Sequence, residues 1–247
     1  MKASVVLSLS LLSLIGLILT GCNENGSNEP LTFSYSFDTD DQGWQGGFSD
    51  LPVNHAVQGY DVNFQYADIP VEDDEGGALL LKGNNHSDDL FLYTMKSFNE
   101  DDGFKSSTEY SVNLSFALAT NVPPGLMGIG GSPGEGVSVK AGGVNFKPET
   151  IEENVGSEPY LRMNIDKGNQ FNSGEDMIIL GDAAKGPGPG QDDYSYQYKY
   201  FNHDFKITTN AEGELWVILG ADSGFEGISE LYFDNISITF TKILAIK

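Results

Sequence analysis

Hydrophobic and polar residues alternate with a period of two along most of the chain after residue 30. The alternation is strictest in residues 31–37 and 110–118. Because successive side chains of a strand point to opposite faces of a sheet, it predicts strands with one buried face. Further strands are predicted at 78–82, 90–96, 137–141, 160–165, 177–180, 215–219 and 231–240.

Turn-forming residues separate these runs. Clusters of Gly, Asn, Asp and Pro fill the gaps, for example at 76–77, 123–125 and 186–190. These residue types favour tight turns, and no segment after residue 21 has a convincing helical period. Many short strands without helices predict an all-β fold, a single β-sandwich of the jelly-roll type over residues 31–242.

The first 21 residues form an export signal in this interpretation. Lys2 precedes an uncharged apolar stretch over 3–20, and the segment ends Leu19-Thr20-Gly21-Cys22. About 18 apolar residues could also span a bilayer, but a membrane anchor does not need a cysteine at this position. The pattern therefore predicts a lipoprotein signal peptide over 1–21, a lipidated Cys22, and a flexible linker that completes 22–30.

Lipidation would place the protein in the cell envelope. A cysteine that carries two or more acyl chains, palmitate among them, anchors a protein stably to a membrane. Asn23 follows Cys22, where retention at an inner membrane usually requires Asp, so a cell with two membranes would carry the protein on the outer one. Cys22 is the only cysteine, which excludes disulfides within the chain.

The chain is strongly acidic. It has 36 Asp and Glu against 13 Lys and Arg, a formal net charge of −23, and loss of Lys2 with the signal would leave 12 against 36. Such a surface repels nucleic acid and anionic headgroups, so no nucleic-acid partner is expected. Cations and neutral partners such as glycans remain possible, and solubility alone also explains the charge.

The first acidic cluster points to calcium. Asp38, Asp40 and Gln42 alternate before Gly43, as in the first half of an EF-hand loop. In an EF-hand loop that starts at Asp38, the twelfth position would be Ser49 instead of the required Glu, which excludes a complete EF-hand. A calcium site of another geometry remains possible, because carboxylates that lie close together are costly unless a cation is among them.

The two ends of the domain resemble jelly-roll carbohydrate-binding modules of the galactose-binding-domain-like kind. The resemblance rests on Phe37-Asp38 followed by Gly43-Trp44, and on the last strand over 231–238. It covers roughly 20 residues and implies that the termini lie side by side, with Asp38 and Asp234 as ligands of a structural calcium. The alternative is that Asp38 closes a turn and Asp234 lies at a bulge that faces solvent.

A second resemblance spans most of the domain. The strings at 84–91, 130–135, 163–170 and 222–227 resemble blocks of a family of uncharacterised bacterial lipoproteins and secreted proteins. This resemblance implies no activity and no functional residue.

The carboxylates in these strings could converge at one end of the sandwich, with Lys140 and Lys167 as counter-charges. A pair of them could bind a metal or a ligand, or do acid–base work. Turn capping is the favoured explanation, because paired acids are ordinary in a chain this acidic. The candidates are Asp88, Asp89, Glu135, Asp166, Asp222 and Glu226.

Four alternating tyrosines form the last candidate site. On a strand, Tyr194, Tyr196, Tyr198 and Tyr200 would share one face at about 6.6–6.8 Å spacing. Such a strip suits stacking on sugar rings, although the rings could instead cover the core.

Two other motifs carry no function. Gly130-Gly131-Ser132-Pro133-Gly134 matches G-x-S-x-G, but Pro133 has no N–H for an oxyanion hole. The three histidines lack metal-ligand spacing.

The sequence thus favours a lipid-anchored binding protein that is calcium-stabilised and binds a polysaccharide. A glycan-active hydrolase and a structural or adhesive surface protein remain alternatives, so whether the chain is an enzyme stays open.

Overall fold

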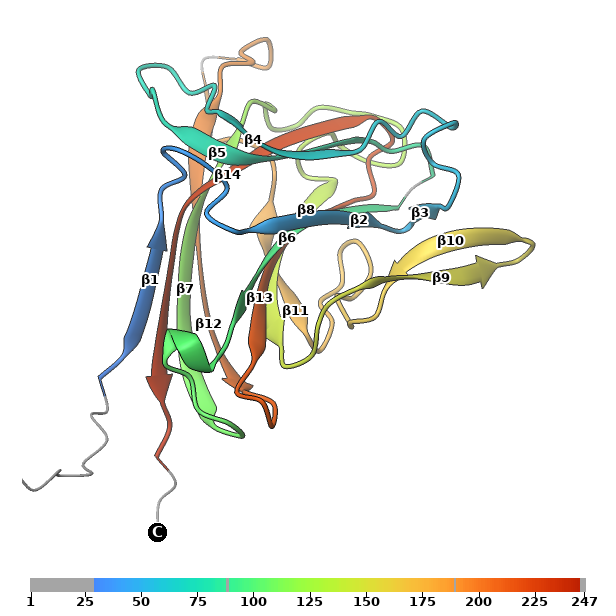
Figure 1. The fold of residues 1–247 in the computed structure, drawn as a ribbon. Helices are drawn as coiled ribbons and strands as arrows, with labels where there is room; N and C mark the ends of the chain where they lie inside the picture. The colour runs from blue at the N-terminus through green and yellow to red at the C-terminus, as the bar shows by residue number, and fades with distance from the viewer. Residues whose placement is uncertain (1–28, 88, 189, 245–247) are drawn as a thin grey trace, which may run out of the picture.

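The computed structural model describes residues 29–87, 89–188 and 190–244, which form a sandwich of two antiparallel sheets (Figure 1). The all-β sandwich prediction is confirmed. The signal segment and Cys22 lie outside the described residues. Sheet A has the order β12-β7-β14-β5-β4, with β1 also paired to β14, and sheet B has the order β11-β8-β13-β6-β2. No helix among the described residues is long and apolar enough to cross a membrane.

Sheet A contains β1 (Leu31–Tyr35), β4 (Asn63–Asp68), β5 (Gly77–Asn84), β7 (Glu109–Thr120), β12 (Gln197–Thr208) and β14 (Ile228–Lys242). Sheet B contains β2 (Gln45–Ser49), β6 (Leu90–Phe98), β8 (Val137–Val144), β11 (Met177–Asp182) and β13 (Leu215–Ser223). A small third sheet contains β3 (Leu51–Pro52), β9 (Thr150–Val155) and β10 (Glu158–Met163). A single 3₁₀ turn, η1, covers Glu100–Asp102.

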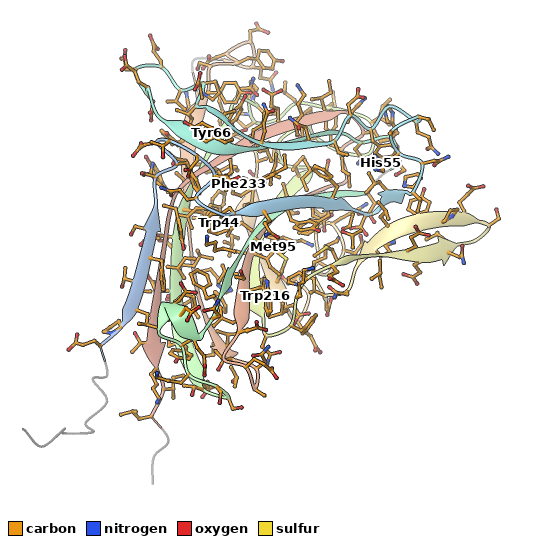
Figure 2. All side chains as sticks on the ribbon, viewed as in Figure 1. Trp44, His55, Tyr66, Met95, Trp216 and Phe233 are labelled. Atoms are coloured by element: carbon orange, nitrogen blue, oxygen red, sulfur yellow. The ribbon has the colours of Figure 1, made fainter. Side chains whose placement is uncertain are left out.

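The core lies between sheets A and B. It is built from the inward-facing residues that the alternation predicts, and Trp44 and Phe233 belong to it with about 1% and 0% exposed surface (Figure 2). Phe37 is also buried, although the first strand ends at Tyr35 and Phe37 has a φ of 52°. The strand therefore ends before Phe37, but the Phe37 ring still packs in the core.

β14 changes partners along its length. Its first half pairs with β5 and its second half with β1, and a bulge between Asp234 and Ser237 separates the two halves. Asn235, at the bulge, has a φ of 49°. A bulge changes the direction of nearby side chains. The bulge where β14 changes partner from β5 to β1 therefore sets the position of Asp234.

The outer face of sheet B is covered by its own chain. The β9–β10 hairpin projects beside it (Figure 1), and residues 164–176 press onto β8. A Cβ at Gly142 would lie 1.9 Å from the Asp176 carbonyl oxygen, so only glycine permits this approach. A second apolar cluster, which includes Phe91, Met163 and Met177, fills the space beneath.

The outer face of sheet A is covered only in part. The β4–β5 connection reaches the start of β12, where Val71 makes a parallel bridge with Tyr196. Beneath it lies a small apolar cluster of Ile69, Ala78, Leu80, Ala119 and Tyr232.

The two ends of the described chain lie at one end of the sandwich (Figure 1). β1 begins beside the end of β14, because Leu31 pairs with Phe240. Lys242 lies opposite Tyr110 at the start of β7, whereas Gln197 lies opposite Thr120 at its end. At about 3.3 Å per residue, the start of β12 is therefore roughly 35 Å from the chain ends.

Candidate functional site

A groove opens on sheet A between the start of β12 and the β4–β5 connection. Its volume is about 840 Å³. Tyr194, which lines the groove, is 55% exposed, and Tyr200, which lies beside Tyr198 and outside the groove lining, is 73% exposed. An exposed tyrosine ring offers an apolar face and a polar tip, which suits the stacking of sugar rings. The groove is lined by Ile69, Pro70, Val71, Glu72 and residues 194–198.

The two middle tyrosines are fixed by contacts within the protein. Tyr196 packs edge-to-face on Tyr232, with ring centroids 5.4 Å apart. The Tyr198 hydroxyl donates to Asp74 Oδ2 at 2.6 Å, and its ring lies over that of Tyr200 at a centroid distance of 6.0 Å. Burial is the largest cause of the raised pKa of both Tyr196 and Tyr198. Only Tyr198 and Tyr200 lie on β12, whereas Tyr194 and Tyr196 precede it. In chain order, the strip of four tyrosines therefore has two anchored rings between two exposed ones.

Tyr198 connects the strip to three carboxylates. Its hydroxyl also lies 3.2 Å from Asp234 Oδ2, and Asp38 lies close enough to Asp234 to help raise its pKa. Asp74 and Asp38 both approach Gly76, where a Cβ would lie 3.1 and 3.8 Å from their carboxylate oxygens. The resemblance-based pair Asp38 and Asp234 thus comes together, joined by Asp74, which the sequence did not single out.

The chemistry of this cluster fits a hard cation. Asp234 is only 5% exposed, and its Oδ1 has no hydrogen-bond partner. Burial raises the pKa of Asp234 to about 6. The nearby carboxylates Asp74 and Asp38 raise this pKa further, whereas hydrogen bonds from the Asn235 backbone and Tyr198 lower it. A buried carboxylate oxygen without a donor is costly, and a cation would relieve that cost. Asp40 instead closes its own turn by accepting the Gln42 N–H at 2.8 Å.

A second candidate lies on the outer face of sheet B. Basic and acidic side chains alternate there in a continuous row of ion pairs, here called the charge ladder, which begins at the fully buried Lys140. Lys140 and Lys167 both bind Asp222 Oδ2 at 2.8 Å, and Lys167 also binds Asp50 Oδ2 at 2.7 Å. Arg162 then bridges Asp50 and Asp89. The charge ladder therefore runs Lys140, Asp222, Lys167, Asp50, Arg162, Asp89.

The ladder opens into a cavity of about 340 Å³ at its Arg162–Asp89 end. Burial, reinforced by Asp50, raises the pKa of Asp89 to about 6 despite Lys167 and Arg162. Burial also lowers the pKa of Lys140, whereas Asp222 and Asp50 outweigh burial at Lys167 and raise its pKa. Three carboxylates thus face three cations.

The ladder already has a cation between two of its carboxylates. One oxygen each from Asp50, Asp89 and Asp222 lies within 4.8 Å of the others, which is metal-like spacing. The Lys167 ammonium, however, already lies between Asp50 and Asp222 and supplies the positive charge. Its side chain also lies 4.9 Å from the Phe91 ring centroid.

The other predicted acids that the structure describes make contacts elsewhere. Asp166 lines the cavity, but its carboxylate accepts the Gly168 and Glu175 N–H groups, which hold its pKa below the usual value. Glu135 accepts the Gly125 N–H and the Ser132 hydroxyl within its own loop. Glu226 lies close enough to Tyr60 to contribute to its raised pKa. Asp88 lies outside the described residues.

Sequence reasoning missed Asp50, Arg162 and Asp74. Asp50 has a φ of 64° in the link between β2 and β3, and Arg162 lies on β10, far away in the chain. Their partners depend on strand pairing that alternation does not reveal. One signal was available: there are few Lys and Arg, so each buried one needs an acidic partner.

No family model matches the sequence, and no curated protein matches it. Among solved structures, the chain is similar to TmCBM27, a carbohydrate-binding module described for specific mannan recognition, at 10% identity and a TM-score of 0.40, covering 87% of this chain and 99% of that one. It is also similar to TmCBM61, solved with β-1,4-galactotriose, at 7% identity and a TM-score of 0.39, with 82% and 92% covered. A third similar structure is the CBM22-1 xylan-binding domain of Xyn10C from Paenibacillus barcinonensis, at 12% identity and a TM-score of 0.39. The match covers 87% of this chain and 97% of that one.

Proposed function

We propose that this protein is a lipid-anchored, extracytoplasmic glycan-binding protein that holds its ligand in the tyrosine groove of sheet A. The observation that carries the proposal is an open groove lined by the exposed Tyr194 and the anchored Tyr196 and Tyr198, with the exposed Tyr200 ring stacked next to Tyr198. Anchoring the middle rings fixes the strip before ligand arrives, which reduces the entropy lost on binding.

The position of the groove supports a role at a cell surface. Residues 22–30 lead into β1, so a lipid at Cys22 would hold the sandwich by the end that carries both chain ends (Figure 1). The groove lies at the opposite end of β7, roughly 35 Å away. In a cell with two membranes, we place the anchor in the outer membrane.

Calcium belongs to the same proposal as a structural ion. Asp234 and Asp38, with Asp74, would supply carboxylate oxygens, and the ion would hold the first strand to the last. It would also fix Tyr198, which donates to Asp74, so an occupied site would stiffen the binding strip.

A hydrolase remains the second candidate because of one observation. Asp89, with a pKa of about 6, lies near Asp50 at the mouth of the 340 Å³ cavity, and an acid paired with a carboxylate is the arrangement of glycosidases. Against it, Asp50 is only 3% exposed and is held by both Arg162 and Lys167. A carboxylate neutralised in this way is a weak nucleophile or base.

One experiment distinguishes the two candidates. Soluble chain 23–247 is incubated with galactan, xylan and mannan oligosaccharides, and both complex formation and new reducing ends are measured. The proposal expects binding without cleavage, lost in the Tyr194→Ala/Tyr200→Ala variant and kept in Phe171→Ala, a matched change at another exposed ring. Cleavage that disappears in Asp89→Asn would establish the hydrolase instead.

A further inference from the structure

The two chain segments that form the tyrosine groove carry acidic side chains without ion pairs, and one of them, Glu72, lines the groove itself. Glu72, Asp73 and Glu75 lie on the β4–β5 connection, and Asp192 lies on the segment that leads to Tyr194. All four are exposed, and no ion pair is found for them among the described residues. The groove therefore has one unpaired carboxylate, Glu72, in its lining beside the tyrosines, and further unpaired acids on the two chain segments that form it.

The lysines on the neighbouring segments are already in use. Lys82 binds Glu230 at 2.6 Å, Lys185 binds Asp193 at 2.8 Å, and Lys199 binds Asp182 at 2.6 Å. The Lys185 side chain is fully buried, so it does not reach into the groove. None of these three lysines is left to bind an anionic group in the groove, and a uronate or sulfated sugar there would face Glu72, a like charge.

We propose that the groove selects glycans that carry free amino groups, such as oligomers of 2-amino-2-deoxy sugars, over neutral and anionic ones. An ammonium group is attracted both by the face of an aromatic ring and by nearby carboxylates. A sugar ring in the groove stacks on Tyr194 with its ammonium group against Glu72, and the exposed acids Asp73, Glu75 and Asp192 on the same segments add to the attraction. This inference rests on the proposed function and adds the ligand class to it.

The test is calorimetric titration of the soluble chain 23–247 with a glucosamine hexamer, its fully N-acetylated counterpart, and a neutral glucose hexamer. The amine-bearing hexamer is expected to bind about tenfold more tightly than the other two at low salt, and the advantage is expected to shrink as salt rises. The variant Glu72→Gln/Asp73→Asn/Glu75→Gln/Asp192→Asn should remove the advantage. Asn tolerates the positive φ of 65° at position 73.

A matched variant separates local recognition from the charge of the whole protein. Glu152→Gln/Glu158→Gln/Glu175→Gln/Glu212→Gln removes the same number of exposed acids elsewhere and should keep the preference. Equal loss in both variants would overturn the inference, because it would show attraction by net charge. Equal or tighter binding of the neutral hexamers would overturn it as well and leave glycan binding intact. Binding of no oligosaccharide at all would overturn the proposed function, and this inference with it.

Discussion

The outer faces of the two sheets use similar residues in opposite ways. On sheet B, the chain closes over its own face, and six charged groups from Lys140 to Asp89 neutralise one another beneath it. On sheet A, the cover is partial, and acids such as Glu72 and Asp192 keep their charge beside exposed tyrosines. A buried and matched set of charges holds segments in place, whereas an open and unmatched set is available to a ligand.

This difference matters because a list of acidic residues does not reveal it. Asp222 and Asp74 are both carboxylates in loops or strand ends, yet one is fully buried between two lysines and the other accepts a tyrosine hydroxyl near solvent. The partner decides the role. Substituting one partner at a time therefore tests the role of each carboxylate.

Loss of Asp222 should have the largest effect. The substitution Asp222→Ala leaves two buried ammonium groups with one carboxylate fewer, and breaking a buried pair costs about 3–5 kcal/mol. Urea unfolding of the soluble chain measures this loss in the free energy of unfolding. Glu149→Ala, which breaks the exposed pair with Lys147, should change it by less than about 1 kcal/mol. Similar losses in the two variants would show that the ladder does not hold sheet B closed.

The contribution of Asp89 to stability should fall as the pH rises from about 4 to about 6. The pKa of Asp89 is about 6 in the folded protein and near 3.9 when unfolded, so the folded state binds more protons in this window and loses stability as they leave. The loss is at most about 3 kcal/mol, because each pKa unit corresponds to about 1.4 kcal/mol and Asp89 is partly exposed.

The variant Asp89→Asn tests this assignment, because it cannot ionise. Its free energy of unfolding should change less between pH 4 and pH 6 than that of the unaltered chain. Asp234 titrates in the same window and accounts for the remaining slope. A slope that Asp89→Asn leaves unchanged would remove Asp89 from the explanation.

Calcium should stabilise the protein by a smaller amount. An ion at a hundredfold excess over its dissociation constant adds about 2.7 kcal/mol, which raises Tm by roughly 5–11 °C for a domain of this size. Asp234→Asn should abolish the shift, whereas Asp40→Asn should keep it, because Asp40 closes its own turn. The shift should also weaken below pH 6, as Asp234 takes up a proton. A shift that depends on Asp40 and not on Asp234 would favour a cation at the exposed turn.

Substitution of the exposed tyrosines should have the smallest energetic effect, and this effect should be confined to glycan binding. Tyr194→Ala or Tyr200→Ala should each weaken glycan binding by about 2–12-fold, since one aromatic contact contributes about 0.5–1.5 kcal/mol. Neither change should alter Tm by more than a degree or two, because both rings are largely exposed. Titration calorimetry and thermal melts measure the two effects. A large fall in Tm without loss of binding would place the rings in the fold and not in the site.

Much of the fold follows from the sequence, because alternation reports directly on a half-buried strand. The strands at 110–118 and 231–240 were predicted inside the longer β7 and β14. β2 and β4 were missed, since Gln45–Ser49 contains two glycines and Asn63–Asp68 alternates weakly. Phe37 was predicted inside a strand, but a positive φ ends the strand before it.

The candidate sites were harder to predict for a different reason. Asp89 and Asp222 belong to one ladder, but their link runs through Asp50 and Arg162, whose approach depends on how β3 pairs with β10. Glu135 and Asp166 carry the same chemistry in the sequence, yet both close their own loops. Residue type indicates what a side chain can do, and only the tertiary pairing decides which partner it meets.

The most direct test of the comparison is a ¹H–¹⁵N titration of chain 23–247 with a pool of galactan, xylan, mannan and glucosamine oligosaccharides. We expect chemical-shift changes confined to residues 69–75 and 192–200, with Arg162, Lys167 and Asp222 unperturbed. Shifts centred on those three ladder residues, or no shift with any oligosaccharide, would contradict it.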